Sequence, residues 1–348
     1  MFFIYYRLKT LGYPVIVKTA VAHPNKALTI YWGNENDELR LPTRSSLSIT
    51  LQGIERPLDY TVTLRVGQSI SRDRVFIDGI EDTGEIQNHF VRHLNIMREH
   101  TGFRGKVEVL TRKSFPVGSG LAGSAASASA LAEAFAGLIE RNSDRRLVSI
   151  MARQGSGSAA RSVFGGFVMW QKGNDNATSY AEQLFDENHW DIRNVIALVS
   201  SAPKKVSSFE GMRISKETCP KSLYSTFSRA ADLHIEEMRA AIAQRDIGKL
   251  GTYYETENTL FRKVCLQSIP ALDYWNKPTH DIFDKVLALR KEGLPVYAGT
   301  DAGPNVHILT SANHVERVIA TFKGMEAIQE LVHCRVGEGS HLIRDDLI

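Results

Sequence analysis

A glycine-rich segment that follows a strand-like stretch and opens a helix-like stretch constrains this chain most. The segment covers residues 116–126 and reads PVGSGLAGSAA, between an alternating pattern at 106–111 and an Ala/Leu-rich pattern at 125–139. Glycine lets the backbone close tightly on a ligand, and the free N–H groups and dipole of a helix N-terminus favour negative charge. The segment therefore predicts an anion site whose natural ligand is a phosphate.

The composition excludes several classes of protein. The 348 residues, 43% of them hydrophobic, are enough for one large or two smaller domains. A formal charge of +3, from 42 basic and 39 acidic residues, argues against a nucleic-acid partner. The three cysteines are far apart and show no CxxC spacing, which predicts neither a disulfide framework nor a zinc site and favours a cytoplasmic location. No stretch approaches the ~20 apolar residues of a membrane helix, so no membrane partner is expected.

Strand-like segments dominate the first half of the chain, and long amphipathic helices dominate after residue 204. Strands are expected at residues 15–20, 27–31, 46–51, 60–66, 74–77, 106–111, 165–171, 195–200, 296–301 and 306–309. Helices are expected at residues 85–99, 125–139, 145–163 (interrupted by GSGS at 155–158), 224–245, 247–265, 280–291 and 312–322. The mixture has no regular βαβ rhythm, which favours the α+β class, and a domain boundary is predicted within residues 195–205.

The glycine-rich segment allows several interpretations when taken alone. Gly118-x-Gly120-x-x-Gly123 matches the dinucleotide fingerprint, but that motif expects a second strand and an acidic residue about 20 residues later. Helical sequence follows instead, which disfavours this interpretation. A Walker loop requires a lysine that Gly123-Ser124 lacks. A tightly packed helix start without any ligand remains an alternative.

Residues 116–125 resemble the phosphate loop of the GHMP kinase superfamily, with Gly123 where a serine is usual. The resemblance implies that the loop binds ATP and that the Ser124 hydroxyl reaches the magnesium ion or the phosphates. The implied ATP-binding residues are Pro116, Gly118, Ser119, Gly120, Leu121, Ala122, Gly123 and Ser124.

Further segments resemble one branch of that superfamily, the mevalonate-diphosphate decarboxylase family. They are PNKALTIYWG at 24–33, LPTRSSLS at 41–48, ARQGSGSAARS at 152–162 and TDAGPN at 300–305. The resemblance spans residues 20 to 310 and implies a two-domain GHMP-kinase-like fold. In that fold, residues 1–198 form an N-terminal ATP-binding domain of the ribosomal protein S5 domain 2-like type, and residues 199–348 form an α/β C-terminal domain.

The resemblance also implies a reaction. Members of this family phosphorylate a tertiary 3-hydroxyl with ATP and then expel that phosphate as CO2 leaves, which creates an alkene. Asp301 is the matching carboxylate near the hydroxyl, and Arg161 is the guanidinium that orients the substrate carboxylate. Outside the motifs, these residues would be a turn aspartate and a surface arginine. The other implied substrate ligands are Asn25, Tyr31, Ser156 and Ser158, and ATP chemistry implies Mg²⁺.

One part of the pattern departs from the diphosphate-using members, which carry lysines on both sides of Tyr-Trp-Gly. Ile30 and Asn34 occupy these positions here, while Lys26 and Arg44 stand nearby as candidate ligands of the 5-phosphate. Ser207 and Ser208 are further candidates. Each missing charge-assisted hydrogen bond costs roughly 1.5–3 kcal/mol, which weakens the case for a diphosphate.

The start Ala22-His23-Pro24 resembles the members that act on mevalonate 5-phosphate. The expected reaction is therefore ATP-dependent decarboxylation of (R)-mevalonate 5-phosphate to isopentenyl phosphate, ADP, phosphate and CO2, in an alternative mevalonate pathway. The first alternative is the 5-diphosphate substrate, which gives isopentenyl diphosphate. A nucleotide-binding protein or small-molecule kinase without decarboxylation is the alternative from another class, and a homodimer stays open.

Overall fold

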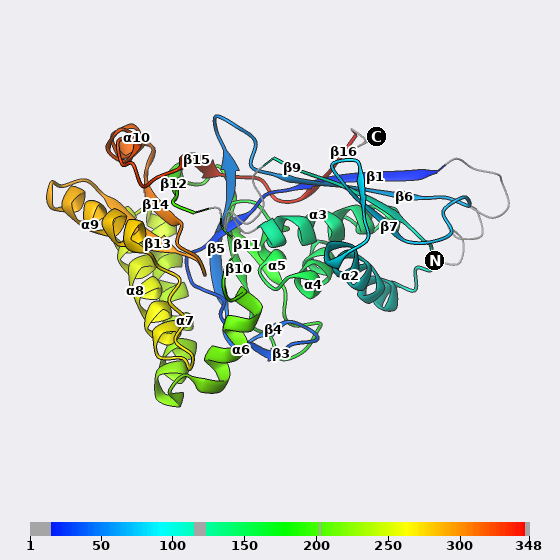
Figure 1. Cartoon of the computed structure of the whole chain (residues 1–348), viewed down its shortest axis with the longest axis horizontal. Coiled ribbons are helices and arrows are strands. Elements are labelled where there is room, and N and C mark those ends of the chain that lie inside the picture. The colour runs from blue at the N-terminus through cyan, green and yellow to red at the C-terminus, as the bar shows by residue number, and fades with distance from the viewer. Residues whose placement is uncertain (1–14, 115–122, 201, 203, 345–348) are drawn as a thin grey trace.

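The computed structural model describes residues 15–114, 123–200, 202 and 204–344 and has two sheets with helices packed against them (Figure 1). The strands are β1 (Ile16–Ala22), β2 (Asn25–Ala27), β3 (Asn34–Asn36), β4 (Leu41–Pro42), β5 (Ser46–Gly53), β6 (Tyr60–Val66), β7 (Arg74–Ile77), β8 (Ile80–Asp82), β9 (Glu108–Lys113), β10 (Phe167–Trp170), β11 (Ala181–Phe185), β12 (Ile192–Leu198), β13 (Val296–Thr300), β14 (Val306–Ser311), β15 (Glu330–Val336) and β16 (His341–Ile343). The helices are α2 (Glu85–Thr101), α3 (Gly123–Leu138), α4 (Arg145–Gly155), α5 (Ala159–Ser162), α6 (Ser208–Thr218), α7 (Lys221–Gln244), α8 (Ile247–Leu266), α9 (Lys277–Lys291), η1 (Ala312–His314) and α10 (Val315–Lys323).

The first sheet has the strand order β16-β1-β6-β9-β7-β8, and its pairs are antiparallel except for β7 with β9. Helix α3 packs across β1 and β6, with α2 and α4 beside it on the same face (Figure 1). Nearly every side chain of α3 from Ala125 onward is buried, including seven alanines. A helix that is apolar on all sides is buried on all sides, and small side chains let the sheet, α4 and α5 approach it closely. Helix α3, which the Ala/Leu-rich pattern predicts, is therefore the centre of the core beneath the first sheet.

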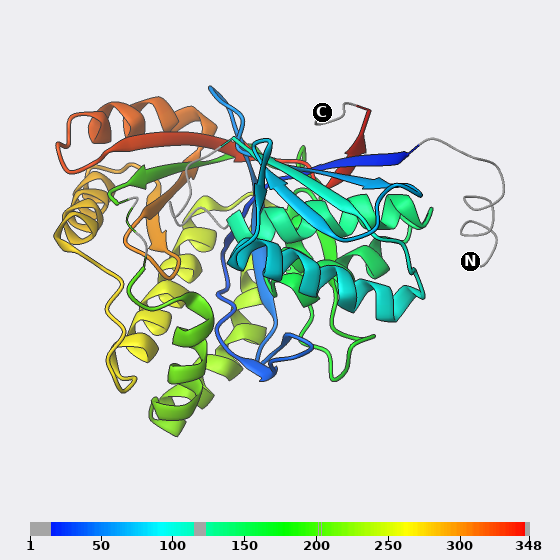
Figure 2. The same cartoon turned by 45° about the vertical axis from the view of Figure 1, so that its right-hand side comes forward.

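The second sheet has the order β11-β10-β5-β15-β12-β14-β13, and β2 also pairs with β5. Side chains of β12 alternate between its faces, as the strand period of two requires. Ile196 and Leu198 join the core beneath α7 and α8, while Val195 and Ala197 join the core beneath α9 and α10 (Figure 2). Strands from both sides of the expected boundary thus share one sheet. The boundary at residue 198 itself stays a prediction.

The structure confirms the α+β class but differs from several expected elements. The strand expected at 27–31 is limited to β2, and residues 28–33 continue as an irregular buried segment whose Leu28 and Thr29 amides both donate to the Leu47 carbonyl. The helix expected at 145–163 is divided into α4 and α5. Helix α6 and strands β3, β4, β8, β11, β15 and β16 were not expected.

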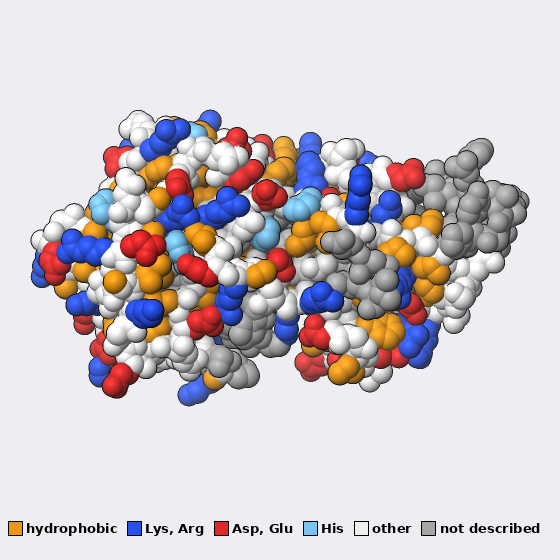
Figure 3. Space-filling model, turned by 90° about the horizontal axis from the view of Figure 1, so that it is seen from above, with side chains coloured by type: hydrophobic (Ala, Val, Ile, Leu, Met, Phe, Trp, Pro, Cys, Tyr) orange, Lys and Arg blue, Asp and Glu red, His pale blue; other side chains and the backbone are white. Residues whose placement is uncertain are grey.

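The structure shows how charge is distributed over the surface and how apolar the helices are. On the face shown in Figure 3, basic and acidic side chains are interspersed rather than gathered by sign. Within the residues that the structure describes, no helix is both long enough and apolar enough to cross a membrane.

Candidate active site

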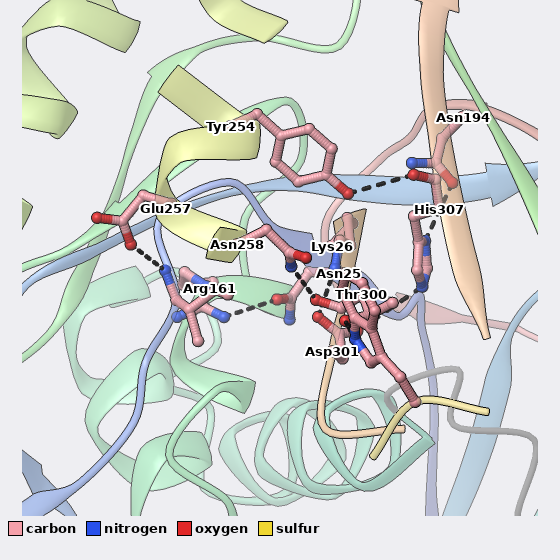
Figure 4. Close-up of polar contacts among 12 residues, drawn as sticks. Asn25, Lys26, Arg161, Asn194, Tyr254, Glu257, Asn258, Thr300, Asp301 and His307 are labelled. Carbon is pink, nitrogen blue, oxygen red and sulfur yellow. Dashed lines mark hydrogen bonds and ion pairs between the residues drawn. The ribbon is translucent and has the colours of Figure 1, made fainter. Parts of the chain in front are cut away.

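Asp301 lies directly after β13 and forms an ion pair with Lys26 of β2 (Figure 4). The Lys26 ammonium is 2.6 Å from Asp301 Oδ1; the Lys26 side chain is 1% exposed and that of Asp301 is 29% exposed. Burial would raise the pKa of Asp301, but the charge and hydrogen bond of Lys26 outweigh it and hold the pKa below its ordinary value. Burial lowers the pKa of Lys26, and Asp301 opposes that shift. The carboxylate is therefore ionised at neutral pH and remains partly accessible.

The motif around Asp301 is anchored to neighbouring elements by side-chain amides and hydroxyls. Asn305 Oδ1 accepts from the amides of Val199 (2.8 Å) and Ser200 (3.1 Å), which ties the turn to the end of β12. Asn258 of α8 donates to the Thr300 carbonyl at 2.8 Å. These bonds satisfy backbone groups that a tight turn would otherwise leave unpaired. They fix the backbone on both sides of the carboxylate.

Arg161 of α5 is buried beside Asn25. Asn25 directly precedes Lys26, so Arg161 and Asn25 lie in the same site as Asp301 (Figure 4). Its Nη2 donates to Asn25 Oδ1 at 3.0 Å and its Nη1 donates to the Ser46 hydroxyl. The Asn25 amide in turn donates to Ser162 Oγ at 2.7 Å. Burial lowers the pKa of Arg161 to about 10, so the guanidinium stays charged at neutral pH. Its Nε is buried and has no acceptor among the described residues.

Tyr31 packs its ring against the glycine–serine segment that joins α4 and α5. A Cβ at Gly157 would lie 2.7 Å from the Tyr31 ring, so glycine is needed for this approach. Ser156 and Ser158 flank this glycine and are half-buried, and neither hydroxyl has a hydrogen bond to a described residue. Tyr31 donates to Asn34 Oδ1, and burial raises the pKa of its hydroxyl to about 12.

Arg44 lies in a fully buried cluster with Glu257 and His234. Its Nη2 is 2.8 Å from Glu257 Oε1, the Phe227 ring lies 3.9 Å from the guanidinium carbon, and His234 bonds the same carboxylate oxygen. These contacts join the segment between β4 and β5 to α7 and α8. The role in substrate binding expected for Arg44 stays a prediction. Its ion pair and ring contact favour a structural role, although its Nε and Nη1 are buried without an acceptor among the described residues.

Most of the expected ATP loop lies outside the described residues, including Pro116, Gly118, Ser119, Gly120, Leu121 and Ala122. Gly123 and Ser124 begin α3, and the Ser124 side chain is exposed there. No group of three or more His, Cys, Asp or Glu side chains in the described residues is arranged to hold a metal ion.

Three polar residues near Asp301 were missed by the sequence reasoning: Asn194, Tyr254 and His307. The hydroxyl of Tyr254 donates to the His307 carbonyl at 3.4 Å, and its ring centroid lies 5.7 Å from the Lys26 ammonium. The period of two in β-strands could have identified Asn194 and His307. His307 pairs with Ile196 on the neighbouring strand, and Asn194 lies two residues before Ile196, so both side chains share the Ile196 face that packs against α8.

Comparison with known proteins gives one consistent result. Residues 22–181 match the family described as the diphosphomevalonate decarboxylase-like N-terminal domain, and residues 194–342 match the mevalonate 5-diphosphate decarboxylase C-terminal domain. The human diphosphomevalonate decarboxylase is 34% identical over 325 residues, which cover 88% of this chain and 80% of the relative.

Solved structures agree with the sequence matches. The mevalonate diphosphate decarboxylase of Staphylococcus aureus superposes with a TM-score of 0.88 at 28% identity, covering 95% of this chain and 99% of that one. A structure of MDDEF in complex with MVAPP, AMPPCP and magnesium gives a TM-score of 0.86 at 31% identity over 95% of this chain and 99% of that one. Fold and site thus define an α+β two-domain protein of the GHMP-like class. Within that class, the chain belongs to the mevalonate diphosphate decarboxylase family, as the motifs indicated.

Proposed function

We propose that this chain catalyses ATP- and Mg²⁺-dependent decarboxylation of a mevalonate phosphorylated at its 5-hydroxyl. The observation that carries the proposal is the presence in one site of an ionised, partly accessible Asp301, paired with Lys26, and a buried Arg161 whose Nε lacks an acceptor among the described residues (Figure 4). Buried donors are rarely left unpaired, and a substrate carboxylate would satisfy this one. The relatives' activity, and the solved complex with AMPPCP and magnesium, support the same assignment.

Each side chain then has a defined task. Asp301 accepts a hydrogen bond from the 3-hydroxyl, and its negative charge favours positive charge that develops at C3 as phosphate leaves. Lys26 keeps Asp301 ionised. Arg161 and Asn25 orient the carboxylate that departs as CO2, while Ser156, Ser158 and Tyr31 contact the rest of the substrate. The γ-phosphoryl of ATP moves to the 3-oxygen as ADP leaves and the hydroxyl proton passes by way of Asp301 to solvent. The C3–O bond then breaks to release phosphate, and the electron pair of the bond to the carboxylate forms the alkene as CO2 departs.

The relatives support the 5-diphosphate as the substrate, because the curated and solved proteins named above are diphosphomevalonate or mevalonate diphosphate decarboxylases. The 5-monophosphate is a second candidate because of one specific feature of this chain. Ile30 is buried in an apolar cluster, and the Asn34 amide donates to Asp37, so neither position supplies a cation. A site with less positive charge favours the less charged substrate.

Arg40 is a better candidate than Arg44 for the end of the substrate that carries phosphate. Its guanidinium lies 4.7 Å from the Phe209 ring centroid and forms no ion pair with a described residue. Arg40 and Arg161 both favour the ionised form of Tyr31, so both guanidinium groups act electrostatically on its hydroxyl. This charge near Tyr31 supports Arg40 as a proposed ligand of the 5-phosphate.

Two arginine variants separate a ligand from a structural residue. Arg40→Met is expected to raise the KM for the mevalonate phosphate about tenfold or more, since one charge-assisted hydrogen bond contributes about 1.5–3 kcal/mol. Arg44→Met is expected to lower the free energy of unfolding by about 3 kcal/mol, because it leaves the buried Glu257 with fewer partners, while KM changes little. Steady-state kinetics and urea unfolding of both variants measure these effects. The reverse pattern would assign the phosphate to Arg44.

Turnover with each substrate tests the proposal itself. The purified chain is incubated with ATP, Mg²⁺ and either mevalonate 5-phosphate or 5-diphosphate, and ADP and CO2 are measured. A higher kcat/KM for the diphosphate would select the substrate of the relatives, and a higher value for the monophosphate would select the second candidate. ADP release without CO2 from both would indicate a kinase instead.

A further inference from the structure

His307 and Asn194 form a buried polar arm that approaches the carboxylate oxygen of Asp301 not bound by Lys26 (Figure 4). His307 Nε2 lies 3.7 Å from Asp301 Oδ2, while Lys26 occupies Oδ1. His307 Nδ1 lies 3.1 Å from the Asn194 side-chain amide. The exposed fraction is 2% for His307 and 1% for Asn194, so water does not replace these contacts.

The partners of the imidazole determine which nitrogen carries the proton. Burial, and then Lys26, lower the pKa of His307 to about 3, so the ring is neutral and has one N–H. A carboxylate only accepts hydrogen bonds, whereas an amide either donates or accepts. Placing the N–H at Nδ1 would turn the Nε2 lone pair toward the Asp301 carboxylate. Placing it at Nε2 avoids that repulsion and leaves Nδ1 to accept from the amide.

The amide of Asn194 is consistent with this assignment. With its oxygen toward His307, the Asn194 Nδ2 is buried and has no acceptor among the described residues. Amide oxygen and nitrogen are assigned from their hydrogen bonds, and the opposite orientation directs this donor at Nδ1. It leaves a buried carbonyl oxygen unpaired, which is tolerated better than an unpaired N–H.

We infer that His307 is a positioning residue, held by an Asn194 donor as the neutral Nε2–H tautomer, which presents an N–H to Asp301 Oδ2. The inference rests on the proposed function. The present 3.7 Å separation is longer than a hydrogen bond, and such contacts commonly shorten when substrate binds. Lys26 and His307 then hold one carboxylate oxygen each, which orients the remaining lone pairs toward the 3-hydroxyl.

The charged and titratable groups around Asp301 give the sign of the pH effect. They are Lys26 from β2, Arg161 from α5, Lys204 from the segment before α6, Tyr254 from α8 and His307 from β14. A donor on the carboxylate stabilises its ionised form, so removing the His307 donor raises the pKa of Asp301. The acid limb of the activity profile therefore moves to higher pH in a variant without that donor.

Three variants test the inference through kcat, KM and the pH profile. His307→Leu removes the donor and is expected to lower kcat about tenfold or more, to change both KM values little and to shift the acid limb upward. His307→Gln restores an N–H near the Nε2 position and is expected to recover most of kcat and the original limb. His333→Leu removes a buried histidine of β15 that faces Glu55, and it serves as the matched control. Unchanged kcat and pH profile in His307→Leu would overturn the inference.

A second measurement does not depend on turnover. Nitrogen-15 NMR of histidine-labelled wild-type protein is expected to show His307 neutral with its proton at Nε2, identified as the signal lost in His307→Leu. A proton at Nδ1 would overturn the inference even if decarboxylation is confirmed. Absence of CO2 release with the Nε2–H signal present would instead contradict only the proposed function.

Discussion

Replacing Asp301 by Asn is expected to reduce CO2 release by about 10²–10⁴-fold while the protein remains folded. The substitution preserves the shape of the side chain, and an amide oxygen still accepts from Lys26, which lies 2.6 Å from Oδ1. It removes the negative charge that the 3-hydroxyl and the developing positive charge at C3 require. The measurement compares single-turnover CO2 release in Asp301→Asn and wild type at saturating ATP.

The control for this variant is Asp281→Asn on α9, where the carboxylate forms an exposed ion pair with Lys277. It is expected to leave turnover unchanged, because exposed pairs contribute little. The affinity of Asp301→Asn for a nucleotide is expected to match that of wild type. Titration with a fluorescent ATP analogue measures this affinity. If Asp301→Asn turned over at the wild-type rate, Asp301 would have only a structural role in its turn. That result would contradict the proposed chemistry.

Replacing Lys26 by Met is expected to reduce both activity and stability. Lys26 is the main group that lowers the pKa of Asp301, so its loss raises that pKa and moves the acid limb of activity to higher pH. The free energy of unfolding is expected to fall by up to about 3 kcal/mol, less than for a fully buried pair because part of Asp301 is exposed.

The stability effect has a definite pH dependence. The pKa of Asp301 is lowered by folding, so its contribution is present above the unfolded value and is lost as pH falls through the folded value. The stability difference between wild type and Lys26→Met should therefore shrink in acid, as measured by urea unfolding at several pH values. A double variant with Asp301→Asn should recover stability but not activity. A constant difference at all pH values would show that the ion pair does not contribute.

The sequence predicted most helices and strands, because their patterns are local. It did not predict β15, although β15 lies between β5 and β12 in the second sheet. Val336 of β15 pairs with Leu51, which is remote in the chain, and no local pattern encodes such a pairing. The strand expected at residues 27–31 was wrong for the opposite reason. Its local pattern suggested a strand, but β2 ends at Ala27, and Leu28 and Ile30 are buried in an irregular segment.

The candidate site was predictable where a motif carried it and not where contacts crossed motifs. Asp301, Arg161 and Asn25 were all named from motifs, and the structure brings the last two into direct contact. The pairing of Lys26 with Asp301 joins residues 275 positions apart, so charge pattern alone suggested a phosphate ligand instead. The role of each of these residues remains a prediction that the variants above test.

Wild-type turnover measures the proposed decarboxylation most directly. Mevalonate 5-phosphate and 5-diphosphate labelled at the carboxyl carbon are each mixed with excess ATP and Mg²⁺, and labelled CO2, ADP and free phosphate are quantified together. Equal amounts of CO2, ADP and phosphate are expected from at least one of the two substrates, with none in the absence of ATP. ADP formation without labelled CO2 from either substrate would contradict the proposed decarboxylation.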